Sequence, residues 1–137
     1  MTNTAFETLA GLPYFAAFFC VSLLLLTMCL ALYVAITPYP EIRLIREGNA
    51  AAAASLGGAI VGFALPLASV VVNSVSLLDM LLWSAVALGV QLVAFAGVRL
   101  MVPAISQHVR EGQVSSGIFL GAVAIALGIL NAASMTY

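Results

Sequence analysis

The side chains able to support acid–base or metal chemistry lie outside the long apolar runs of this 137-residue chain. They are its five carboxylates and its single histidine: Glu7, Glu41, Glu47, Asp79, Glu111 and His108. General acid–base catalysis needs titratable groups within hydrogen-bond reach of each other, and a metal site needs clustered ligands. These residues are scattered singly over loops and segment ends. We therefore expect no catalytic site, no metal site, no cofactor and no enzymatic activity.

Uncharged polar side chains inside the apolar runs give the remaining functional signal. Gln91 lies near the middle of one run, with Ser84 on the same helical face. Two other runs contain Ser69, Asn73 and Asn131. Polar groups in lipid face neighbouring helices or a water-filled path. These residues therefore either line a polar path or hydrogen-bond between helices, which would stabilise a bundle by about 0.6 kcal/mol each.

The composition indicates that lipid surrounds most of the chain. Hydrophobic residues make up 64% of it and charged residues only 7%, against ~25% charged residues in soluble domains. The net charge of −1, with no basic tract, gives no indication of nucleic-acid binding. Four apolar runs are long enough to span a ~30 Å hydrocarbon core. We predict one all-α transmembrane domain over residues 1–137, a four-helix bundle with spans at 14–36, 50–72, 80–98 and 114–135.

The second span has one face of small, polar and helix-breaking residues. At about 100° per residue, this face comprises Ser55, Gly58, Gly62, Pro66, Ser69 and Asn73. The Gly58-x-x-x-Gly62 spacing allows a second helix backbone to approach closely. Pro66 cannot donate to the Gly62 carbonyl and predicts a kink. We expect the second span to occupy a central position in the bundle.

The arginines predict the orientation. All four lie in the connections after the first and third spans: Arg43, Arg46, Arg99 and Arg110. By the positive-inside rule, both connections are cytoplasmic and both termini are periplasmic. Tyr33 and Tyr39 are expected in the inner aromatic belt.

Charged side chains at the ends of the spans could act at the mouths of a path. Glu41 on the inner side and Asp79 on the outer side would attract cations, or each is simply a solvated charge at a helix end. Arg99 is expected to extend to the cytoplasmic interface. Arg46 and Arg110 either set the topology or bind lipid phosphate or a cytoplasmic partner.

A short internal repeat lies in the two arginine-containing connections. Ile45-Arg46-Glu47-Gly48-Asn49 recurs 64 residues later as Val109-Arg110-Glu111-Gly112-Gln113. This recurrence predicts two helical hairpins of the same orientation, related by an axis along the membrane normal.

Further short motifs are spread over nearly the whole chain. They include Ile36-Thr37-Pro38-Tyr39, Asn49-Ala50-Ala51-Ala52, Pro66-Leu67, Asn73-Ser74, Gln91-Leu92, Phe95-Ala96-Gly97-Val98-Arg99-Leu100 and Asn131-Ala132-Ala133. The set resembles the YjfL-like family of small bacterial inner-membrane proteins, a domain of unknown function. The resemblance implies four transmembrane helices in the bacterial inner membrane. It also implies an ion-channel-like component encoded near genes for a phage-shock-protein-A-like protein, and it assigns no functional residue.

We expect an oligomeric inner-membrane protein that forms a small-ion or small-solute pathway. The pathway or helix-packing candidates are Gly58, Gly62, Pro66, Ser69, Asn73, Asp79, Gln91 and Asn131. The alternative is a non-conducting scaffold that recruits a phage-shock-protein-A-like, membrane-stress partner. Its cytoplasmic-loop candidates are Glu41, Arg43, Arg46, Arg99 and Arg110. An intramembrane charge would favour the pathway, and loops buried against a partner would favour the scaffold. The other expected partners are membrane lipid and further copies of the chain.

Overall fold

The computed structural model describes residues 2–135, and every regular element within them is an α-helix. In chain order the helices are α1 (Thr2–Ala10), α2 (Leu12–Ile36), α3 (Glu41–Arg46), α4 (Ala50–Asn73), α5 (Leu77–Met101), α6 (Ile105–Arg110) and α7 (Val114–Ser134). Four helical segments are long and apolar enough to cross a membrane: Asn3–Ile36, Ala50–Asn73, Leu77–Met101 and Val114–Ser134. The all-α class and the four membrane-capable helices are therefore confirmed for the described residues.

Local capping explains where the long helices begin and end. Ser76 accepts a hydrogen bond from the Asp79 backbone N–H at 3.2 Å, so α5 begins at Leu77 and not at the predicted residue 80. Asn49 caps α4 in the same way, accepting from the Ala52 N–H at 3.0 Å. In the same connection between α2 and α4, Pro38 and Pro40 prevent α2 from continuing into α3.

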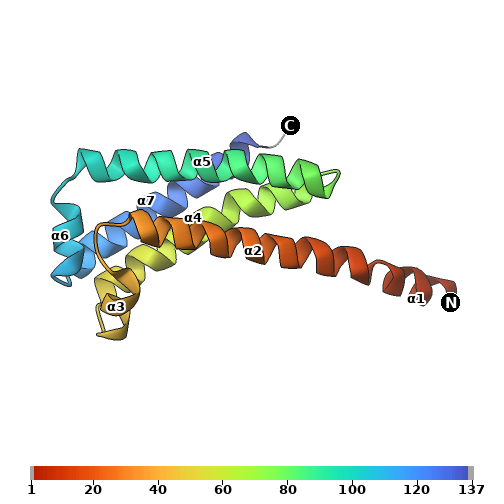
Figure 1. Ribbon diagram of the computed structural model, residues 1–137, viewed down its shortest axis with the longest axis horizontal. Helices are drawn as coiled ribbons and strands as arrows, with labels where there is room; N and C mark the ends of the chain where they lie inside the picture. Colours follow the sequence, from red (N-terminus) through yellow and green to blue (C-terminus); the bar gives the residue numbers. More distant parts are fainter. Residues whose placement is uncertain (1, 136–137) are drawn as a thin grey trace.

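The first membrane-capable segment is longer than the predicted span 14–36. Residues 2–10 form α1, and only a short break at Gly11 separates it from α2. Pro13 is compatible with the helix because it lies in the first turn of α2, where its missing N–H would have no helical partner. Helix α1 and the N-terminal part of α2 project away from the other helices (Figure 1).

The short helices α3 and α6 end in the same type of turn. Gly48 and Gly112 have φ angles of +88° and +81°, a left-handed conformation that favours glycine. The N–H of Asn49 then donates to the carbonyl of Leu44 at 2.9 Å, and Gln113 repeats this bond to His108 at 3.0 Å. These two turns contain the repeated sequence.

Helix α4 is central, and it packs on α2, α3, α5 and most extensively on α7 (Figure 1). The α4–α7 contact brings two backbones together through glycine. A Cβ atom at Gly58 would collide with the backbone of Gly121, and one at Gly62 would lie 2.5 Å from the carbonyl oxygen of Ala124. Such close approach is how small residues let helices associate in lipid. Pro66 is buried inside α4, which remains one helix from Ala50 to Asn73.

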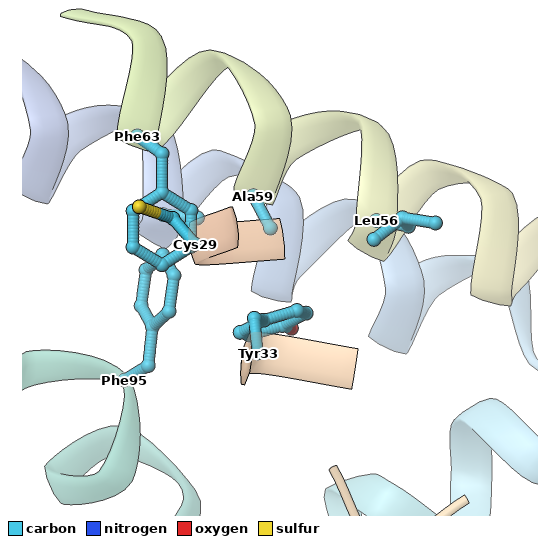
Figure 2. Close-up of a cluster of buried hydrophobic side chains, with 7 residues drawn as sticks. Cys29, Tyr33, Leu56, Ala59, Phe63 and Phe95 are labelled. Carbon is cyan, nitrogen blue, oxygen red and sulfur yellow. The ribbon is translucent and has the colours of Figure 1, made fainter. Parts of the chain in front are cut away.

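A buried aromatic cluster fills the space between α2, α4 and α5. The rings of Tyr33, Phe63 and Phe95 meet edge to face, with centroids 5.2–6.0 Å apart. Cys29 and Ala59 complete its surroundings (Figure 2). We call the three rings the aromatic cluster.

Candidate functional site

A buried ion pair lies at the end of the bundle that holds α3 and α6. Glu41, the first residue of α3, is fully buried, and its Oε1 lies 3.9 Å from Nη2 of Arg99 in the last turn of α5. The same Nη2 donates to the hydroxyls of Tyr33 at 2.9 Å and Tyr39 at 3.2 Å. Nη1 donates to Ser106 at 3.1 Å. We call these five residues the Glu41–Arg99 site.

The guanidinium of Arg99 also interacts with the faces of two tyrosine rings. Its Cζ lies 5.3 Å from the ring centroid of Tyr39 and 5.7 Å from that of Tyr33, within the range of cation–π attraction. One side chain of α5 thus contacts α2, the α2–α3 connection, α3 and α6. The Glu41–Arg99 site therefore joins α2, α3, α5 and α6 at this end of the bundle.

The environment of Glu41 makes its charge sensitive to pH near neutrality. Burial raises the pKa of the Glu41 carboxyl to about 7, while the positive charge of Arg99 and the Tyr39 hydroxyl act against that rise. Neither carboxylate oxygen accepts a hydrogen bond of normal geometry from residues 2–135, so Tyr39 acts on Glu41 as a nearby dipole. Burial also raises the pKa of Tyr39, which remains a neutral hydrogen-bonding group.

The sequence interpretation of this site needs correction. Glu41 was expected to be a charge at a mouth or a solvated helix end, and the structure buries it completely. That Arg99 extends to the cytoplasmic interface stays a prediction, and its guanidinium contacts Glu41 and the two tyrosines. The inner aromatic belt also stays a prediction for Tyr33 and Tyr39, which are both buried in the protein. The burial of Glu41 results from tertiary packing. After the turn at Pro38 and Pro40, α3 packs against α4, and Glu41 comes to lie beside Arg99.

The predicted polar residues of the third and fourth spans meet between α5 and α7. Gln91, which is fully buried, donates from Nε2 to the Ala124 carbonyl at 3.1 Å. Asn131 donates from Nδ2 to the Ala87 carbonyl at 3.0 Å and lies 3.4 Å from Oε1 of Gln91. Ser84 is buried on α5, two helical turns before Gln91. Its hydroxyl has no hydrogen-bond partner among the described residues. These contacts join two helices, as the packing interpretation requires.

A groove of about 390 Å³ on the outside of the bundle reaches this buried polar pair. Gln91 and Asn131 contribute to its wall, and the rest of the lining is mainly apolar: Trp83, Val86, Val90, Ala94, Leu127, Leu130, Ser134 and Met135.

The other pathway candidates lie near the opposite end of the bundle. Ser69 donates to the Ala132 carbonyl at 3.0 Å and so joins α4 to α7. Asn73 donates to the Ser69 carbonyl at 2.8 Å. Asp79 accepts from the Val75 N–H at 3.3 Å, within the turn between α4 and α5. Ser69 thus lies in the α4–α7 contact, while the hydrogen bonds of Asn73 and Asp79 stay within α4 and the turn that follows it.

The loop arginines have different surroundings. Arg43 is exposed and lies 3.7 Å from Glu47 one turn later, and Arg46 is also exposed. Arg110 donates to the carbonyl of Pro38. Asn49 donates to the Val109 carbonyl at 2.9 Å, which joins the two turns directly. Within residues 2–135, no three histidine, cysteine or acidic side chains are grouped to hold a metal ion.

Four membrane-capable helices, a glycine-mediated contact and a buried ion pair define a multi-pass α-helical membrane protein. The sequence matches the family described as Domain of Unknown Function (DUF350) over residues 7–135, and the chain belongs to that family. It is 40% identical over 129 residues to the UPF0719 inner membrane protein YjfL of Escherichia coli strain K12, which covers 94% of this chain and 98% of the relative. The relative from Escherichia coli O157:H7 gives the same values. No solved structure matches. The predicted YjfL-like family and inner-membrane location are confirmed.

Proposed function

We propose that the protein self-associates in the inner membrane and forms a pathway for small cations, gated by the Glu41–Arg99 site. The observation that carries the proposal is the completely buried carboxyl of Glu41 facing Arg99. Taking such a pair out of water costs several kcal/mol per ion, and apolar side chains would stabilise a bundle at least as well. A scaffold does not need such a buried pair, so we assign this pair, at the end of the membrane-capable helices, to the control of ion passage.

The polar residues mark a route along the bundle. From the Glu41–Arg99 site it reaches Gln91 and Asn131, and then Ser69 and Asn73 near the opposite end. The aromatic cluster lies between the first two groups and fills the interior of the protomer. The route is therefore closed within one chain. The groove beside Gln91 and Asn131 is where a second copy would complete it.

The charge state of Glu41 would control the gate. Burial raises the pKa of Glu41 in this closed arrangement to about 7, so the closed arrangement favours the protonated carboxyl. Ionised Glu41 favours an arrangement in which water reaches the carboxylate, and α3 then moves away from α5. The charged group beside Glu41 is Arg99, and Tyr39 contributes a neutral hydroxyl. Cation flux should therefore rise as the pH rises through neutrality.

Flux measurements on purified protein in liposomes test the pathway. At about pH 8, where Glu41 is mostly ionised, wild type should conduct potassium above the level of empty liposomes. Gln91→Leu should reduce the flux because it removes the central polar side chain. The matched control is Val93→Leu, an exposed position on the same helix. No flux at any voltage or lipid composition would contradict the pathway.

That negative result would favour the scaffold. Its supporting observation is that Arg43 and Arg46 are exposed on α3, where an acidic, phage-shock-protein-A-like partner could contact them.

The proposed orientation places α3 and α6 in the cytoplasm and both termini in the periplasm. The arginine distribution supports it, and the matching turns at Gly48 and Gly112 support two hairpins related by an axis along the membrane normal. In a background without Cys20 and Cys29, we expect Val75→Cys to react with an impermeant maleimide added to spheroplasts. Gln113→Cys should react only after the membrane is permeabilised. The reverse labelling pattern would overturn the orientation.

A further inference from the structure

A cavity of about 950 Å³ opens beside the Glu41–Arg99 site. Its lining includes four hydrogen-bond donors from α6 and the last turn of α5: Arg99, Ser106, Gln107 and Arg110. Its apolar lining comes largely from the membrane-capable helices α2 and α5 and includes Ile36, Phe95, Ala96 and Leu100. The cavity therefore combines a cationic part with a hydrocarbon-compatible part.

The charge in this cavity is only partly compensated. Arg110 is exposed, forms no ion pair within residues 2–135, and has the uncharged carbonyl of Pro38 as a hydrogen-bond acceptor. The single carboxylate in the lining, Glu111, accepts from Gln107 at 3.1 Å. Arg99 directs Nη1 to Ser106 on α6, while its Nη2 faces the tyrosines and Glu41. An additional anion beside Arg110 would complement the donors.

The apolar wall indicates where such an anion would come from. Ile36 and Leu100 are 60% and 80% exposed, and both lie in the last turn of a membrane-capable helix. That position corresponds to the boundary between hydrocarbon and headgroups. A free anion would gain nothing from these side chains, whereas the acyl chain of a lipid would cover them.

We infer that this cavity binds an anionic phospholipid, with the phosphate beside Arg110 and Ser106 and an acyl chain against Ile36 and Leu100. Guanidinium groups form strong charge-assisted hydrogen bonds with phosphate oxygens. Basic pockets between transmembrane helices are known to accept anionic headgroups. The inference does not depend on ion conduction.

Native mass spectrometry of detergent-purified protein, titrated with phosphatidylglycerol, tests the site. Wild type should retain phosphatidylglycerol more tightly than phosphatidylcholine with the same acyl chains. Arg110→Gln should weaken phosphatidylglycerol binding about fivefold, the effect of one arginine near an anionic headgroup. Arg46→Gln is the matched control, because Arg46 occupies the same place in the repeated turn and lies outside the cavity.

A second variant separates a loss of lipid binding from a loss of folding. Gln107→Glu adds a negative charge to the lining and should weaken phosphatidylglycerol binding without removing an arginine. Equal affinity for the two lipids, or equal loss in Arg110→Gln and Arg46→Gln, would contradict the inference. Displacement of the lipid by millimolar inorganic phosphate would assign the site to a free anion and overturn the lipid assignment.

Discussion

Replacing Gly62 with leucine is expected to separate α4 from α7 and to lower the stability of the purified protein by about 3 kcal/mol. A Cβ at this position would lie 2.5 Å from the carbonyl oxygen of Ala124 and 2.9 Å from its carbon. Both neighbours are backbone atoms, which cannot move aside as a flexible side chain can. The same Cβ would lie 3.2 Å from Nε2 of Gln91 and disturb its hydrogen bond.

The matched control for this substitution is Gly57→Leu on the same helix. Gly57 is exposed, and a Cβ there would meet no atom within 4 Å. The leucine should even gain roughly 0.8 kcal/mol of helix propensity. Thermal unfolding and elution volume in detergent would compare the two variants. Equal behaviour would mean that the α4–α7 contact does not hold the bundle together.

Arg99→Gln is expected to destabilise the protein by about 3 to 5 kcal/mol at about pH 8, because it leaves an ionised Glu41 buried without its counter-ion. The variant also loses the charge-assisted hydrogen bonds to Tyr33 and Tyr39 and the bond to Ser106. Part of the defect should be recovered by adding Glu41→Gln, since the double variant has no buried charge at the site.

The same defect should shrink at low pH. The pKa of Glu41 in the folded protein, about 7, lies above the ordinary value of 4.5, so the folded state binds the proton more tightly. The stability contributed by Glu41 is thus fully present below 4.5 and is lost as the pH rises through 7. Arg99→Gln should accordingly be less destabilised at about pH 5 than at about pH 8. Thermal unfolding would contradict this electrostatic description if Arg99→Gln lost the same stability at both pH values and the double variant recovered none of it.

The long helices could be predicted because their signals are local. Each apolar run is a signal carried by one continuous stretch of the chain. The Ser76 cap is also local but was missed, so the predicted start of α5 was three residues late. The glycine face of α4 also follows from helical spacing, and the structure places Gly58 and Gly62 against α7. By contrast, α1 was missed because its polar residues resemble a leading loop, and Pro13 was not recognised as a residue of the first helical turn.

The Glu41–Arg99 site could not be predicted from the sequence. Its members come from helices that meet only in the folded bundle, and each one alone is typical of a membrane interface. A tyrosine near a helix end predicts an aromatic belt, and an arginine there predicts contact with headgroups. Glu41 becomes buried and meets Arg99 only because α3 packs against α4 in the folded bundle. The available clue was the concentration of charge around the proline turn.

The most direct test of the gated pathway is potassium flux through liposomes as a function of pH, comparing wild type with Glu41→Gln. Wild-type flux should rise as the pH rises from about 6 to about 8, with its midpoint near the Glu41 pKa of about 7. Glu41→Gln imitates the protonated carboxyl, so its flux should be low and independent of pH. Wild-type flux that does not change with pH, or a Glu41→Gln variant that keeps the wild-type pH dependence, would contradict the account.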